Sequence, residues 1–176
     1  MGFEILKSEK TFQGKVFDVR VDQVRLPDGK LSRIDVVEHA GAVTMIPVDA
    51  QGQMWFVRQH RHPIGLDLLE LPAGVMNQGE SPEISAQREL REEIGMAAGR
   101  LKKVGEFFLA PGYSTEFMAV FLAEDLQPAP LSPDEGELIT IVKVPPHQVR
   151  QLIENGQVRD AKSLAALFLY HMTSIK

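Results

Sequence analysis

The sequence indicates an α/β fold in which helices cover a mixed β sheet. Several segments alternate apolar and polar residues, which is the periodicity of half-buried strands. Three other segments carry helix-starting and helix-ending residues around recurring apolar positions. These elements follow one another as strands, one helix, more strands and two helices. That order is typical of a mixed sheet packed against helices.

Strand signals begin near the N-terminus. Residues 15–22 alternate in polarity, and Pro27-Asp28-Gly29 has the composition of a tight turn. We therefore expect a hairpin formed by residues 21–26 and 31–39. Further along the chain, pairs of apolar runs flank other turn residues. The strands expected beyond the first hairpin are residues 42–48, 53–59, 66–71, 101–109, 117–123 and 137–144.

Capping residues place the three helices. Each combines a residue that can accept from free N–H groups, or a proline that fits a first turn, with a residue suited to a helix end. The expected boundaries are Ser81-Pro82 and Gly95 for the first helix, Pro145-Pro146 and Asn155-Gly156 for the second, and an Asp160 N-cap for the third.

Composition narrows the classes of function. The 176 residues are 44% hydrophobic and 24% charged, which argues against a disordered chain. No apolar run is long enough to cross a bilayer, and the first residues lack a signal-peptide pattern. The chain has no cysteine, which excludes disulfides and is compatible with a cytoplasmic protein. Its net charge of −5 makes it a poor nucleic-acid binder, so we expect neither nucleic acid nor membrane as a partner.

The first helix carries a stripe of carboxylates. A helical wheel places Ala86, Leu90 and Ile94 on one apolar seam, with Glu89, Glu92 and Glu93 in the adjacent arc. Like charges one turn apart repel each other, and the penalty grows beside an apolar seam. A hard divalent cation such as Mg²⁺ or Mn²⁺ would relieve that repulsion. The alternative is a solvated acidic face of a surface helix, because Glu is a good helix former.

Spacing around this helix resembles a family motif. Five residues separate Gly74 from Glu80, and residues 88–96 then read Arg-Glu-Leu-Arg-Glu-Glu-Ile-Gly-Met. This segment resembles the complete Nudix box. The resemblance implies a Nudix-type α/β/α sandwich with a mixed sheet, and an enzyme that hydrolyses a nucleoside diphosphate linked to another group with the help of divalent metal.

The resemblance also implies roles for the box residues. Glu89 and Glu93 would be metal ligands and catalytic residues, with Glu92 close by and often sharing a metal, and the backbone carbonyl of Ala73 would be a further ligand. Arg88 and Glu80 would form an orienting pair that holds the helix carboxylates in place.

Similarity continues outside the box and is greatest to the ADP-ribose pyrophosphatase branch. Residues 57–63, 69–74 and 160–167 match that branch, as does 109–116 except for Ala110 in place of a serine. The residues that would bind substrate are Arg33, Arg61, Glu70, Pro111, Gly112 and Glu116. In the acidic segment 133–137, Glu135 resembles the general base and Glu137 an additional metal ligand, although an ordinary polar loop is the alternative reading.

The branch also suggests an assembly. Residues 1–40 would form an N-terminal β segment that pairs across a homodimer, and residues 41–176 the Nudix hydrolase domain; a lid packed on its own domain is the alternative. We expect Mg²⁺-dependent hydrolysis of ADP-ribose, or a related nucleoside diphosphate sugar, to AMP and ribose 5-phosphate. The open alternatives are GDP-mannose, a flavin dinucleotide or an oxidised nucleotide as substrate, and a binding module without turnover.

Overall fold

The structure is a computed structural model that describes residues 2–133 and 138–174. Its backbone divides into two compact units. The first consists of Met1–Gly41 with Phe108–Phe117, and the second of Ala42–Phe107 with Met118–Lys176. Each unit is described by itself below.

The first unit contains a three-stranded antiparallel sheet. Strands β1 (Glu4–Gln13), β2 (Asp18–Arg25) and β3 (Leu31–Glu38) pair in that order. The predicted hairpin is confirmed as β2 and β3. Strand β1 was not predicted, and every one of its residues is exposed. Because both faces of β1 carry polar side chains, its sequence shows no clean alternation between a buried and an exposed face.

A turn from elsewhere in the chain completes this unit. The carbonyl oxygen of Ala110 accepts hydrogen bonds from the backbone N–H groups of Tyr113, at 3.1 Å, and Ser114, at 2.9 Å. The N–H of Val37 donates to the carbonyl of Tyr113 at 2.8 Å, and Val37 forms a parallel bridge with Ser114. The 108–117 segment is therefore held against β3 by backbone hydrogen bonds.

The second unit is built on two sheets. One is mixed and has the order β7-β4-β9-β8, with β4 and β9 parallel and β4 and β7 antiparallel. The other is antiparallel, with the order β10-β5-β6. The strands are β4 (Ala42–Pro47), β5 (Met54–Arg61), β6 (Leu66–Glu70), β7 (Ala73–Val75), β8 (Met96–Phe108), β9 (Phe117–Pro128) and β10 (Ile139–Val144).

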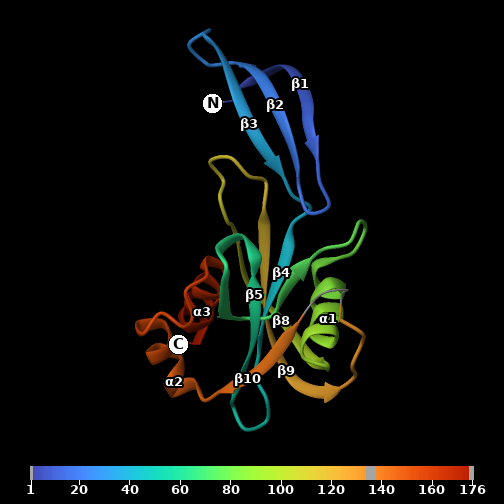
Figure 1. The fold of residues 1–176 in the computed structure, drawn as a ribbon, viewed down its shortest axis with the longest axis vertical. Helices are drawn as coiled ribbons and strands as arrows, with labels where there is room; N and C mark the ends of the chain where they lie inside the picture. Colours follow the sequence, from blue (N-terminus) through green and yellow to red (C-terminus); the bar gives the residue numbers. More distant parts are fainter. Residues whose placement is uncertain (1, 134–137, 175–176) are drawn as a thin grey trace. The chain divides into compact units, whose positions relative to one another are not determined.

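Three α-helices cover these sheets from two sides, so the predicted α/β sandwich is confirmed. Helix α1 (Pro82–Glu93) lies on one side, and α2 (Pro146–Glu154) and α3 (Ala161–Ser174) lie on the other (Figure 1). A short 3-10 helix, η1 (His62–Ile64), joins β5 to β6. No helix among the described residues is long and apolar enough to span a membrane.

The core of the second unit forms between the sheets and the C-terminal helices. Apolar side chains from both sheets meet side chains of α2 and α3 there, and burying them supplies the main driving force for folding. The buried members are Ile46, Met54, Phe56, Leu69, Leu71, Val120, Val144, Val149, Val158, Ala166 and Leu167. Trp55, Phe56 and Val57 of β5 are also buried.

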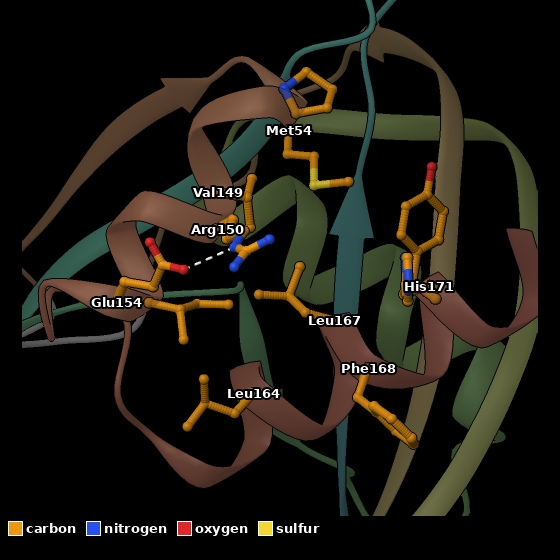
Figure 2. A pocket seen from close by; sticks show the side chains of 11 residues that line it. Met54, Val149, Arg150, Glu154, Leu164, Leu167, Phe168 and His171 are labelled. Atoms are coloured by element: carbon orange, nitrogen blue, oxygen red, sulfur yellow. Dashed lines mark hydrogen bonds and ion pairs between the residues drawn. The ribbon is translucent and has the colours of Figure 1, made fainter.

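A groove lies at the surface of α2 and α3. Figure 2 shows Val149, Leu164, Leu167 and Phe168 around it, with an Arg150–Glu154 ion pair of 2.7 Å at its rim. Its volume is about 570 Å³. Because α2 and α3 lie on the side of the sheets opposite α1 (Figure 1), this groove is separate from the acidic helix.

Candidate catalytic site

Helix α1 begins and ends where its capping residues predict. The Ser81 hydroxyl accepts a hydrogen bond from the N–H of Ile84 at 3.3 Å, and Pro82 is the first helical residue. After the cap at Ile94 the chain turns at Gly95, whose φ is +71°. A left-handed backbone of this kind favours glycine because glycine has no Cβ. The predicted apolar seam is confirmed, since Ala86, Leu90 and Ile94 are buried.

Two glutamates of the predicted stripe are buried against the strand that precedes the helix. Glu89 is 8% exposed and Glu93 is 6% exposed. The N–H of Ala73 in β7 donates to Glu93 Oε2 at 3.1 Å. At Gly74, a Cβ would lie 1.9 Å from Glu89 Cδ, so the absence of a side chain leaves the space that the carboxylate fills. The alternative of a solvated acidic face is therefore wrong for Glu89 and Glu93.

Arg88 connects several carboxylates of the site. Its guanidinium contacts Glu80 at 3.1 and 3.0 Å, Glu89 at 2.5 Å and Glu92 at 2.8 Å. It also donates to the carbonyl of Val75 at 3.0 Å. The predicted pairing of Arg88 with Glu80 is confirmed. A planar guanidinium can hold several oxygen acceptors at fixed angles, which lysine cannot do.

The charges of this network shift its proton equilibria. Hydrogen bonds from Arg88 lower the pKa of Glu80 to about 2, although partial burial acts in the opposite direction. The same contact with Glu80, together with Glu89 and Glu92, raises the pKa of the Arg88 guanidinium. Glu80 therefore stays ionised, and Arg88 charged, at every pH at which the protein is expected to work.

The oxygen donors of this site fit a hard divalent cation. Carboxylates of Glu89 and Glu93 are buried beside the Ala73-Gly74 backbone, and hard cations prefer carboxylate and carbonyl oxygens. Glu92 lies in the same network through Arg88. Among residues 2–133 and 138–174, no three His, Asp or Glu side chains are already grouped closely enough to hold a metal.

A second charged cluster lies at the ends of β5 and β6. Arg61 donates from Nε to Glu70 Oε1 at 2.9 Å and from Nη2 to Glu70 Oε2 at 2.6 Å. Lys162 of α3 contacts the same Glu70 carboxylate and Asp160 Oδ1, the latter at 2.9 Å. Burial raises the pKa of Glu70, but the hydrogen bonds and charges of Arg61 and Lys162 outweigh it, so that pKa lies below its usual value.

Besides its contact with Lys162, the Asp160 side chain caps helix α3. Its Oδ1 accepts from the N–H of Ser163 at 3.0 Å, which confirms the predicted N-cap of α3. Ser163 Oγ in turn accepts from the N–H of Leu71 at 2.8 Å. Sequence reasoning did not assign a role to Lys162. The only local signal was its position two residues after the N-cap, in a segment already noted as similar to the ADP-ribose pyrophosphatase branch.

Several predicted site residues lie elsewhere. Arg33 belongs to the first unit, where it is exposed and lies 3.6 Å from Asp35. Pro111 and Gly112 form the turn closed by Ala110, and the carbonyl of Glu116 accepts from the N–H of Leu109 at 3.1 Å. Their roles in substrate binding stay predictions. Glu135 and Glu137 lie outside the described residues, so the general base and the additional metal ligand also stay predictions.

Comparisons with protein families identify the two regions of the chain. Residues 38–167 match the family described as the NUDIX domain. Residues 3–33 match a second family, described as the nucleoside diphosphate sugar hydrolase N-terminal domain. The boundary between these two matches falls within β3 (Leu31–Glu38).

Individual relatives cover nearly the whole chain. An ADP-ribose pyrophosphatase of Bacillus subtilis is 38% identical over 92% of this chain and 89% of its own length. Another, from Mycobacterium tuberculosis, is 36% identical over 96% of this chain and 83% of its own. A solved structure of an ADP compounds hydrolase superposes with a TM-score of 0.87 at 26% identity, covering 98% of this chain and 94% of the other.

Proposed function

This chain belongs to the Nudix family of hydrolases, and we propose that it hydrolyses ADP-ribose or a related nucleoside diphosphate sugar with the help of Mg²⁺. Water would add to one phosphorus of the diphosphate while the bridging P–O bond breaks. With ADP-ribose the products would be AMP and ribose 5-phosphate. The substrate assignment comes from the ADP-ribose pyrophosphatase relatives at 38% and 36% identity.

One structural observation supports catalysis rather than binding alone. Glu89 and Glu93 are buried side by side with the Ala73-Gly74 backbone, and Gly74 leaves room for a carboxylate that any larger residue would displace. Burying carboxylates costs free energy unless a partner compensates their charge. A cation held by these carboxylates is what metal-assisted hydrolysis of a diphosphate would require.

Each residue of the site has a proposed role in hydrolysis. Glu89, Glu93 and the Ala73 carbonyl would hold the cation, with Glu92 close by and Glu137 as an additional ligand. A divalent cation held there would offset the charge of the diphosphate and make a water molecule more acidic. Arg88 and Glu80 would orient the helix carboxylates, since Arg88 contacts Glu80 and also Glu89 and Glu92. Glu135 would accept the proton of the attacking water.

Further residues are proposed to bind the substrate. Arg61 would bind the diphosphate, because a guanidinium can form paired hydrogen bonds with phosphate oxygens. Glu70 forms a bidentate ion pair with Arg61. We propose that Arg33, Pro111, Gly112 and Glu116 contribute contacts to the nucleotide or the sugar.

A screen for turnover tests this function. Purified protein is incubated with ADP-ribose, GDP-mannose, a flavin dinucleotide and an oxidised nucleoside triphosphate, each with Mg²⁺ and with excess chelator, and the released phosphomonoesters are quantified. The proposal predicts that ADP-ribose is cleaved fastest and only with metal. If another nucleotide is cleaved faster, that nucleotide is the better candidate for the substrate. Tight binding of ADP-ribose without any cleavage would favour a binding module.

The first unit also supports a proposal about assembly. We infer that its sheet pairs with a second copy of the chain and forms a homodimer. Large apolar side chains are exposed on this unit, and such patches commonly mark protein interfaces. They are Phe3, Ile5, Leu6, Phe12, Val16, Phe17 and Leu31. Sedimentation at micromolar concentration tests the inference, because a monomer there would contradict it. A cytoplasmic location stays a prediction from the sequence.

A further inference from the structure

In the charged cluster at the ends of β5 and β6, the buried carboxylate of Glu70 contacts two cations, and one of these, Lys162, also contacts Asp160. Glu70 is 1% exposed, and it contacts both Arg61 and Lys162. Either contact alone would form an ion pair with this carboxylate. The two cations can therefore have different roles when a substrate is bound.

The two cations differ in their access to solvent. The Arg61 side chain is 40% exposed, whereas that of Lys162 is 11% exposed. Arg61 is therefore the member of the pair that can turn towards an anionic ligand, while Lys162 is enclosed.

Lys162 is held in place independently of Arg61. Its ammonium group lies 2.9 Å from Asp160 Oδ1, and Asp160 caps the helix that carries Lys162. Ser163, the next residue, is completely buried and accepts a hydrogen bond from the N–H of Leu71, the residue that follows Glu70. Two contacts that do not involve Arg61 thus join the first turn of α3 to the end of β6. They are the ion pair of Lys162 with Glu70 and the hydrogen bond from the N–H of Leu71 to Ser163 Oγ.

Releasing Arg61 from Glu70 would be costly without this second cation. A buried carboxylate that loses its only partner is left with an uncompensated charge, and such losses are among the largest single effects on stability. With Lys162 present, Glu70 keeps a buried cation after Arg61 leaves.

From this arrangement we infer that Lys162 is a positioning residue: it compensates Glu70 so that Arg61 can exchange this carboxylate for the diphosphate of the substrate. The inference rests on the proposed function, since it takes a diphosphate as the ligand of Arg61. Lys162 itself need not touch the substrate. Its effect would pass through Glu70 to Arg61.

Binding of an uncleavable ligand tests the inference without requiring turnover. The probe is ADP-ribose with a methylene group in place of the bridging oxygen, and its Kd is measured by calorimetry in Mg²⁺. Lys162→Met should raise this Kd by about tenfold or more, because Arg61 is then retained by Glu70. Lys162→Arg should stay within about threefold of the wild type, since it keeps a buried cation. Lys103→Met, at an exposed lysine paired with Glu106 on β8, is the matched control and should not change the Kd.

A second substitution separates this role from a merely structural one. Changing Glu70 to Gln removes the charge that Lys162 compensates, so the double variant Glu70→Gln with Lys162→Met should bind more tightly than Lys162→Met alone. If Lys162 only stabilised α3, the double variant would show no such recovery. Activity gives the same separation, because Lys162→Met should raise KM for ADP-ribose far more than it lowers kcat.

The outcomes are distinguishable. Wild-type protein that does not bind the probe would contradict the proposed function, and this inference with it. Wild-type binding with an unchanged Kd in Lys162→Met, or without recovery in the double variant, would overturn the role of Lys162 alone. Thermal unfolding of each variant confirms that it is folded, and Lys162→Gln takes the place of Lys162→Met if that variant is not.

Discussion

The carboxylate of Glu89 occupies the space that a side chain at Gly74 would fill. A Cβ on Gly74 would lie 1.9 Å from Glu89 Cδ and 2.0 Å from Glu89 Oε1. Two atoms that are not bonded cannot approach so closely, so a side chain at position 74 must displace the carboxylate. The glycine that opens the box is therefore required by the glutamate fifteen residues later in the sequence.

The first prediction follows from this contact. Gly74→Ala should move the Glu89 carboxylate and lower kcat for ADP-ribose by about a hundredfold, as misplacement of a catalytic group by about 1 Å can do. The control is Gly105→Ala in β8, where a Cβ meets the flexible end of Leu169 at 2.8 Å and should be accommodated. Equal activity of the two variants would contradict a catalytic position for Glu89.

A second prediction concerns Glu80 and pH. Its pKa is lowered to about 2 in the folded protein by the hydrogen bonds of Arg88, from about 4.5 otherwise. Below about pH 4.5 the unfolded chain therefore binds a proton that the folded chain does not, and protons favour unfolding. The stability that this carboxylate contributes is complete above that pH and is lost as the pH falls towards about 2.

Comparing the wild type with Glu80→Gln isolates this contribution. Urea unfolding at pH 7 should show the variant less stable by roughly 1–2 kcal/mol, since a charge-assisted pair is replaced by a neutral hydrogen bond. The difference should shrink as the pH is lowered through the window between the two pKa values. A difference that stays constant down to pH about 2.5 would show that the ionised form of Glu80 is not what stabilises the fold.

A third prediction separates a metal ligand from an ordinary carboxylate of α1. Glu93→Gln should weaken Mg²⁺ binding in a calorimetric titration with nucleotide present, and should lower kcat by roughly 10²–10⁴. Glu83→Gln is the matched control, because Glu83 lies in the first turn of the same helix and is exposed. Near-normal activity of Glu93→Gln at low Mg²⁺ would show that Glu93 is not a ligand of the catalytic metal.

Local patterns in the sequence predicted the elements that carry the site. The caps of α1 at Ser81 and Gly95 and its seam of Ala86, Leu90 and Ile94 are where periodicity places them. These features depend on residues within one or two turns of each other. The same holds for the hairpin of β2 and β3, whose turn residues stand together in the sequence.

Contacts between distant segments could not be predicted in the same way. Glu70 and Lys162 are 92 residues apart, and nothing in the periodicity of β6 or α3 indicates that they meet. Strand β1 was not predicted for a different reason. Its residues are exposed on both faces, so its sequence lacks the alternation that marks a half-buried strand.

The last prediction concerns the proposed general base. Glu135→Gln should depress kcat for ADP-ribose while leaving the Kd of the methylene-bridged analogue nearly unchanged, because a base acts on the attacking water and not on the diphosphate. An effect of roughly 10²–10⁴ on kcat is expected when such a proton acceptor is removed. Single-turnover kinetics at saturating substrate measure the chemical step directly.

Asp134→Asn provides the control for this prediction, since it removes a neighbouring negative charge without removing the proposed base. If kcat falls equally in both variants, the charge of the segment matters and not a proton acceptor at position 135. If Glu135→Gln instead raises only the Kd, Glu135 binds substrate and the base lies elsewhere. A fall in kcat confined to Glu135→Gln, with a pH–rate profile that loses its acidic limb, would identify Glu135 as the group that must be deprotonated, because a base works only in its ionised form.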